Sequence, residues 1–229
     1  MIDKLRYASA LLLVAAVSTG CKDPASTAPA ATVGAVMATG GTPAPTAQAV
    51  APTGPTAAAP LPGGLRFSAG PSKLGFVGSK VTGQHEGSFL TFTGAIKAGP
   101  GDKPEGGAVN LEIDMASVKT DSEKLDGHLK SPDFFDVARF PKAIFESLEI
   151  RPEPQGPATH RVAGNLTLHG VTRAISFPST ITVEAGKVIV KAEFSIGRKD
   201  FNIVYPGKPD DLIRDGVVIR IALEVPRAK

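Results

Sequence analysis

The stretch Val217-Val-Ile-Arg-Ile-Ala-Leu-Glu-Val225 decides the fold class, because a large apolar side chain falls on every second residue. Valine, isoleucine and leucine occupy the odd positions, whereas Arg220 and Glu224 fall on the even ones. A period of two is typical of a strand with one buried face and one face in water. The stretch therefore predicts an antiparallel sheet, since strands of buried parallel sheets are apolar on both faces.

The same alternation recurs upstream. It is clearest in 108–115, 162–169, 175–184 and 188–196, and further strands are predicted at 65–69, 73–81, 88–97 and 142–151. Short segments rich in glycine and proline separate them, and Pro152-Glu153-Pro154 is one predicted turn. Pro178 lies inside a strand pattern, which predicts a sheet edge or a bulge there. The pattern predicts eight or nine antiparallel strands, and an eight-stranded sheet that closes on itself has an interior that is either filled by side chains or holds one slender ligand.

One helical pattern interrupts the strands. Thr120 and Glu123 have the spacing of a capping box, with Thr120 as the N-cap, and apolar residues follow at helical intervals. Ser131-Pro132 predicts a second helical start, since proline favours the first helical position. The sequence thus predicts an all-β fold of about eight antiparallel strands, with a short α-helical insert that could cover one end of a closed sheet.

Composition changes sharply at Leu65. Of the 43 residues from 22 to 64, 35 are Ala, Pro, Thr, Gly or Ser, whereas all 11 phenylalanines of the chain lie between Phe67 and Phe201. A segment so poor in large apolar side chains does not bury enough surface to offset its ordering entropy. We therefore predict a disordered linker within 21–64 and a folded domain at 65–229.

The first twenty residues have the pattern of a signal peptide. Lys4 and Arg6 precede an apolar run that is too short to span a bilayer. Ser18-Thr19-Gly20 then leads directly into Cys21, the only cysteine, and this ending resembles the lipobox of bacterial lipoproteins. We expect a signal peptide at 1–20 and an acylated Cys21 that anchors the chain to a membrane. The alternative is an ordinary signal peptide that is cut nearby and leaves a free thiol.

The residue after the cysteine bears on which membrane holds the anchor. Lys22 follows Cys21, and Asp23, the type of residue that favours inner-membrane retention in enteric bacteria, comes one position later. We expect a lipid-anchored protein of the bacterial cell envelope on the periplasmic side, at the outer membrane in preference to the inner.

Charge and composition exclude several classes of function. The net charge is +3 among 47 charged residues, which does not indicate nucleic-acid binding. One cysteine excludes a disulfide framework within the chain and a multi-cysteine zinc site, and none of the four histidines is paired at i,i+4. The domain contains no nucleophile elbow and no cysteine nucleophile. We expect no metal, no cofactor and no catalysis, and the sequence leaves the oligomeric state open.

Nine sequence blocks, in order along 65–229, resemble the YceI family of lipid/polyisoprenoid-binding proteins. The two most specific blocks are Ser131-Pro-Asp-Phe-Phe-Asp136 and Leu166-Thr-Leu-His-Gly-Val-Thr172. The resemblance implies an extended, lipocalin-like antiparallel barrel in an exported protein. It also implies that the barrel holds an isoprenoid-type or other long-chain lipid in a tunnel, and it carries over no catalytic residue.

Any tunnel must be lined by the rows of side chains that face inward from the strands. The candidate lining residues are Leu111, Ile113, Phe145, Leu166, Leu168, Phe177, Phe194, Ile219 and Ile221. The same rows would fill the interior of a solid barrel, because eight strands lie near the size at which a barrel first encloses a ligand. A structural envelope protein with a filled barrel is therefore one alternative to a lipid carrier.

His128 and His169 lie in specific blocks and carry the other alternative, a hydrolase-type enzyme. Either imidazole could act as a general base beside a neighbouring acid, or contact a ligand headgroup. Both histidines also stand next to glycines, where a side chain commonly forms a turn or cap hydrogen bond.

Overall fold

The computed structural model describes residues 23–38 and 57–227, which form thirteen strands, several of them very short, and one α-helix. The strands are β1 (Thr32–Gly34), β2 (Leu65–Ser68), β3 (Lys73–Lys80), β4 (Gly83–Phe89), β5 (Phe92–Lys97), β6 (Ala108–Asp114), β7 (Val118–Thr120), β8 (Lys142–Gln155), β9 (Ala158–Leu168), β10 (Val171–Val183), β11 (Lys187–Gly197), β12 (Gly207–Lys208) and β13 (Asp211–Pro226). The helix is α1 (Glu123–Lys130).

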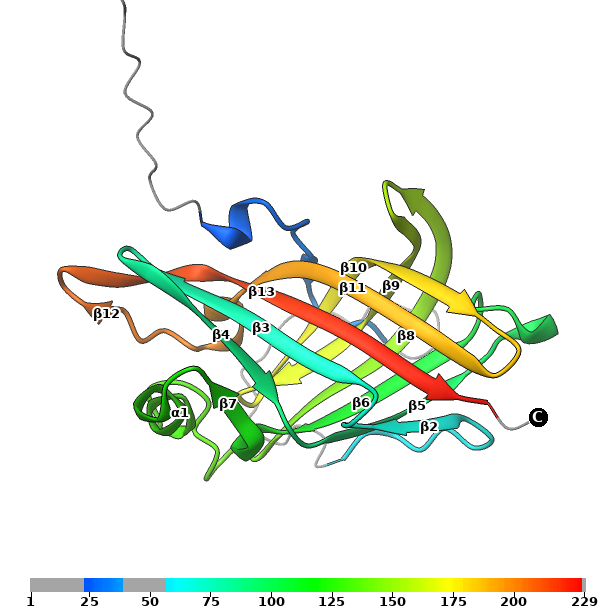
Figure 1. The fold of residues 1–229 in the computed structure, drawn as a ribbon, viewed down its shortest axis with the longest axis horizontal. Coiled ribbons are helices and arrows are strands. Elements are labelled where there is room, and N and C mark those ends of the chain that lie inside the picture. The colour runs from blue at the N-terminus through cyan, green and yellow to red at the C-terminus, as the bar shows by residue number, and fades with distance from the viewer. Residues whose placement is uncertain (1–22, 39–56, 228–229) are drawn as a thin grey trace, which may run out of the picture.

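One antiparallel sheet contains all of these strands. Its order is β2-β5-β6-β8-β9-β10-β11-β13-β3-β4-β7, with β1 paired to β10 and β12 paired to β13. The sheet curls into an elongated half-barrel, and α1 lies beside β7 at one end (Figure 1). Register shifts in β8 and β13 contribute to the curl, since bulges increase strand twist. The predicted all-β antiparallel barrel with a helical insert is confirmed.

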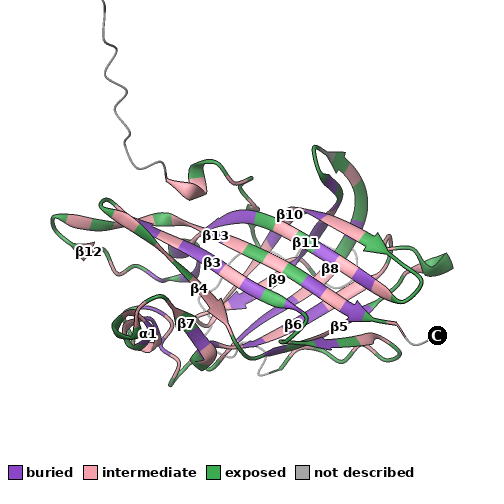
Figure 2. Cartoon of the chain, in the orientation of Figure 1, coloured by how far each residue is buried: buried purple, intermediate pink, exposed green. Residues whose placement is uncertain are grey.

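The apolar rows face inward. Buried and more exposed residues alternate along β3, β11 and β13 (Figure 2). Most buried apolar side chains belong to one cluster inside the curl, in which Phe201 and Val225 have no exposed surface. A smaller cluster around Leu129 and Phe134 packs under α1. This division places the main core along the half-barrel and the second cluster at its helical end.

The strand boundaries differ from the predictions at several places. Residues 83–97 form two strands, β4 and β5, where one was predicted over 88–97. Pro152-Glu153-Pro154 lies within β8 rather than in a turn, because this part of β8 pairs only with β9 and needs no further N–H donors. Pro178 pairs with β9 on one side and falls between the β1 and β11 pairings on the other. That position agrees with the predicted edge.

The helical insert also differs in detail. Ser122, not Thr120, is the N-cap residue of α1. The Thr120 hydroxyl accepts a hydrogen bond from the Ser122 amide and donates one to Asp126, so it supports the helix from outside. Residues 131–135 form turns in place of a second helix.

The prediction of disorder is wrong for residues 23–38. Within this part of the linker, β1 pairs with β10, and the Met37 amide donates to the Asn165 side chain at 2.9 Å. Composition reflects only how much side-chain surface a segment can bury, whereas this segment is held mainly by backbone groups that pair with free sheet edges. The domain boundary at residue 65 stays a prediction. The signal peptide at 1–20 and the acylation of Cys21 also stay predictions, because these residues lie outside the described ones.

Candidate ligand-binding cavity

The half-barrel is hollow. A cavity of about 360 Å³ lies inside it, walled by side chains of β3, β4, β6, β8, β9, β10, β11 and β13 and by α1 at one end. Its wall is almost wholly apolar, with Leu74, Ile175 and Ile196 among the buried contributors. The volume lies within the roughly 300–1,000 Å³ of typical ligand pockets.

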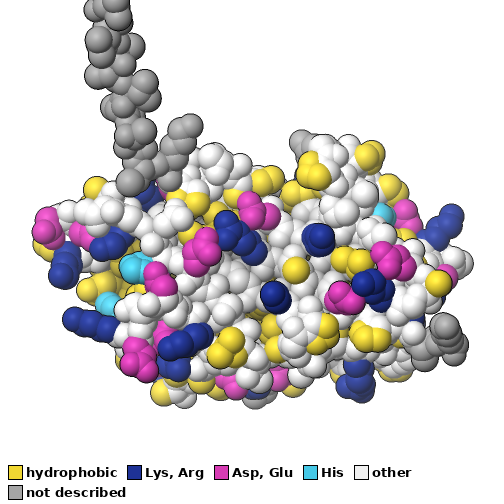
Figure 3. Space-filling model, in the orientation of Figure 1, with side chains coloured by type: hydrophobic (Ala, Val, Ile, Leu, Met, Phe, Trp, Pro, Cys, Tyr) yellow, Lys and Arg dark blue, Asp and Glu magenta, His cyan; other side chains and the backbone are white. Residues whose placement is uncertain are grey.

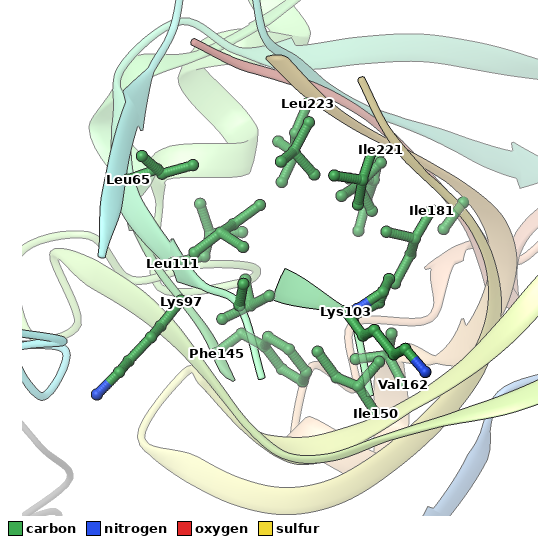
Figure 4. A pocket seen from close by; sticks show the side chains of 18 of the residues that line it. Leu65, Lys97, Lys103, Leu111, Phe145, Ile150, Val162, Ile181, Ile221 and Leu223 are labelled. Atoms are coloured by element: carbon green, nitrogen blue, oxygen red, sulfur yellow. The ribbon is translucent and has the colours of Figure 1, made fainter. Parts of the chain in front are cut away.

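A second cavity of about 70 Å³ lies inside the opposite end. Figure 4 shows Leu65, Ile150 and Leu223 around this space, and Lys97 extending away from it. Four residues line both cavities and therefore mark the constriction between them: Leu111, Phe145, Phe177 and Ile221. Phe177 contacts Phe145 with a ring-centroid distance of 5.7 Å and stacks on Phe194 at 4.1 Å.

The structure brings all nine predicted lining residues together. Besides the four at the constriction, the larger cavity is lined by Ile113, Leu166, Leu168, Phe194 and Ile219. Leu166, Ile219 and Ile221 are only half-buried although they face inward. Inward-facing side chains keep exposed surface only where the space beside them is empty. This observation distinguishes a hollow barrel from the filled alternative, while a ligand-binding role for these residues stays a prediction.

Helix α1 covers one end of the larger cavity, and the carboxylate of Asp126 holds it in place. Leu125 and Leu129 of α1 reach the larger cavity, as do Phe134 and Phe135 from the following turns. The buried Asp126 fastens α1 to β7, since it accepts from the Thr120 amide at 2.6 Å and from the Thr120 hydroxyl at 2.7 Å. Lys119 lies 2.7 Å from its other oxygen. These partners, Lys119 first, lower the pKa of Asp126 to about 2 from an ordinary value of 3.8.

We expect Asp126→Asn to lower stability at neutral pH and to make less difference in acid. A carboxyl whose pKa is lowered by folding stabilises the fold above its unfolded value, and this contribution is lost as pH falls through the folded value. The stability difference between wild type and variant should therefore shrink between about pH 4 and about pH 2. Urea unfolding at several pH values measures it. A difference that stays constant with pH would contradict this role.

Polar side chains gather at the helical end of the larger cavity. Lys80, His85 and Arg198 line it, and each has partners: Lys80 pairs with Asp211, and His85 Nδ1 lies 2.9 Å from Asp121 Oδ1. Histidine and hydrophobic side chains lie together at the end of the molecule that carries α1 and β12 (Figure 3). The sequence predictions missed these residues. Alternation could have found His85, which shares a face of β4 with Phe89.

Arg198 has the most complete set of partners. It is buried, and its guanidinium donates to the carbonyl oxygens of Ile203 (2.6 Å), Arg214 (3.1 Å) and Ile213 (3.3 Å). Burial lowers its pKa, and the nearby Asp215 carboxylate opposes that shift. Arginine nevertheless keeps its charge in proteins. Arg198 therefore joins the loop after β11 to the start of β13 beside the cavity.

His128 and His169 do not line either cavity. His128 Nε2 lies 3.0 Å from Asp133 Oδ2, and its ring packs edge-on against Phe134 and Tyr205. His169 has a positive φ of 51° in the β9–β10 turn, and its Nδ1 bonds the Phe201 carbonyl at 3.1 Å. The side chain of His128 thus joins the end of α1 to the residues that follow it, and that of His169 joins the β9–β10 turn to the loop after β11.

The described residues contain no group of three or more His, Cys, Asp or Glu placed to hold a metal ion. In the same part of the chain, no helix has the length and apolar character needed to cross a membrane.

The fold and the cavity define a class of proteins, antiparallel barrels with a hollow, apolar interior. Residues 66–225 match the YceI-like domain, and the chain belongs to the YceI family. It is 35% identical over 123 residues to a UPF0312 protein of Yersinia enterocolitica. That match covers 51% of this chain and 62% of the relative, so it spans less than two thirds of the relative's length.

Solved structures share the fold. BcnA of Burkholderia cenocepacia is 25% identical and superposes with a TM-score of 0.59, covering 67% of this chain and 96% of that protein. A polyisoprenoid-binding domain from Saccharophagus degradans, implicated in plant cell wall breakdown, superposes with a TM-score of 0.57 at 19% identity. It covers 72% of this chain and 99% of that domain, and at this identity the likeness concerns the fold alone.

Proposed function

We propose that the protein binds the chain of an isoprenoid-type or other long-chain lipid inside the half-barrel and does no chemistry on it. The observation that carries this proposal is the hollow apolar interior, in which two cavities share four lining residues. Burial of an apolar chain contributes about 0.8 kcal/mol per CH₂ before ordering costs. Family membership and the polyisoprenoid-binding domain of similar fold support the same ligand class.

The arrangement of polar groups favours binding over catalysis. The two histidines that a hydrolase would use lie outside the cavities and already bond Asp133 and the Phe201 carbonyl. The charged and imidazole side chains at the cavity have partners of their own: Lys80 and His85 pair with carboxylates, and Arg198 donates to backbone carbonyl oxygens. A chain inside the cavity would therefore meet mainly apolar side chains along its length.

Organic extraction of the purified protein, followed by mass spectrometry, tests the proposal. We expect a copurifying lipid with a long apolar chain in near-stoichiometric amount. The variants His128→Ala and His169→Ala should keep it, because neither side chain lines a cavity. Protein without lipid that also fails to take up added lipid would contradict the proposal.

We further propose that Cys21 is acylated and holds the protein at the periplasmic face of a membrane, at the outer membrane in preference to the inner. Its support is the sequence pattern alone, a short apolar run followed by Ser18-Thr19-Gly20 and the only cysteine. More than one acyl chain gives stable anchoring. In a detergent phase split, wild type should enter the detergent phase and Cys21→Ala the aqueous phase. Identical partition into the aqueous phase would refute the anchor.

A further inference from the structure

Two neighbouring strands of the half-barrel separate along part of their length. β10 and β11 pair with each other only between Thr180–Val183 and Val188–Lys191. Toward the other ends of both strands, residues 29–34 lie between them. Ser195 of β11 donates its amide to the Pro29 carbonyl at 2.9 Å and accepts from the Ala31 amide at 2.8 Å. On the other side, Thr32–Gly34 pair with Ala174–Ser176 of β10.

The inserted segment fills the space between two strands whose side chains line the larger cavity. Ile175 and Phe177 of β10 and Phe194 and Ile196 of β11 line the larger cavity on the two sides of the separation. Ala31 and Val33 pack against the same apolar cluster from between these strands. In Figure 1 the blue N-terminal segment runs down beside β10 and β11. Removing residues 29–34 would leave a lateral gap next to the cavity.

This wall strand is held less firmly than its neighbours. β1 has only three residues, and the side chains of residues 31–34 are small, so they bury little surface against the sheet. β11, in contrast, pairs with β13 along its whole length, from Lys187 to Gly197. Local opening costs least where few apolar contacts and hydrogen bonds must break. Opening of this segment should therefore cost less free energy than opening of β11.

We propose that residues 29–34 are a detachable wall strand, and that the space they fill between β10 and β11 is a lateral entrance through which a lipid chain enters the larger cavity. This inference rests on the proposed lipid binding. The chain just before this segment is also bound to the sheet, because Asp23 accepts from the Ser79 hydroxyl at 3.1 Å and lies 3.7 Å from Arg214. The strand that closes the wall thus belongs to the same segment as the proposed anchor.

A disulfide across the outward-facing pair Thr32 and Ser176 tests the inference. The two residues are direct partners in antiparallel pairing, so their Cα atoms lie about 4.5–5.5 Å apart, within disulfide range. The variant Thr32→Cys, Ser176→Cys is made in a Cys21→Ala background, so that only the new thiols can pair. The probe is cis-parinaric acid, whose fluorescence follows its uptake and its release to phosphatidylcholine vesicles.

We expect the oxidised variant to take up and release the probe at least about tenfold more slowly, at unchanged affinity. Reduction of the disulfide should restore both rates. The matched control is Ser68→Cys, Thr93→Cys, a directly opposed, exposed pair between β2 and β5 away from the entrance. Its rates should not depend on oxidation. A second variant, Ala31→Pro, removes the amide that bonds Ser195 and should accelerate release.

The outcomes separate the two proposals. Probe binding at equal rates in the oxidised and reduced forms, with no acceleration in Ala31→Pro, would overturn the lateral entrance and leave lipid binding intact. Wild-type protein that binds no probe and contains no extractable lipid would overturn lipid binding and the entrance with it.

Discussion

Leu166→Trp should empty the barrel of lipid and leave the protein folded. Leu166 projects into the larger cavity and is only half-buried, so an indole ring has space to enter. In a packed core the same enlargement costs about 1–3 kcal/mol, because it forces strained rotamers. Here the extra ring occupies the volume that the lipid would use. We expect a loss of lipid affinity of about tenfold or more and a change in unfolding free energy below about 1 kcal/mol.

Ile221→Trp extends this test to the constriction. Ile221 lines both cavities, so an indole there would stand between them and leave most of the larger cavity free. A lipid that passes through the constriction should be lost from this variant as well. A shorter ligand that fills only the larger cavity should stay bound.

Ala222→Trp is the matched control, because Ala222 lies next to Ile221 on β13 and is exposed. Extraction with mass spectrometry gives the lipid content, and urea unfolding gives the stability of each variant. Wild-type lipid content in Leu166→Trp would show that the ligand lies elsewhere. Lost stability without lost lipid would show that the interior around Leu166 is packed and that the lipid lies elsewhere.

Arg198→Ala should cause the largest loss of stability among substitutions of polar residues at the cavity. Its guanidinium satisfies three backbone carbonyl oxygens, those of Ile203, Ile213 and Arg214. An unsatisfied buried acceptor costs about 1–3 kcal/mol. Because water entering the site would replace some of the lost bonds, we expect a total cost of about 3–5 kcal/mol.

Arg198→Lys should recover only part of this loss, since one ammonium group does not reproduce the planar fork of donors. Lys199→Ala is the matched control, because the neighbouring side chain is exposed and should contribute less than about 0.5 kcal/mol. Urea unfolding midpoints with unchanged slopes measure all three variants. A cost below about 1 kcal/mol for Arg198→Ala would show that the three carbonyl groups find other donors.

The linker shows where composition misleads. Its Ala, Pro, Thr and Gly content predicts disorder, because such residues bury little surface. Residues 29–34 nevertheless lie between β10 and β11, since Ser195 and the edge of β10 offer backbone groups that any extended segment can bond. Backbone pairing of this kind leaves no pattern in the side chains.

The amino-acid sequence by itself determined the sheet and its inner face. Alternation in stretches such as 217–225 specifies which side chains turn inward, because a strand places successive side chains on opposite faces. All nine predicted lining residues consequently meet around the cavities. Only the tertiary structure decided that the interior is hollow, that Arg198 and His85 reach it, and that the N-terminal segment lies between β10 and β11. These features depend on the curl of the sheet and on contacts between residues far apart in the chain, such as Ala31 with Ser195, which no local pattern encodes.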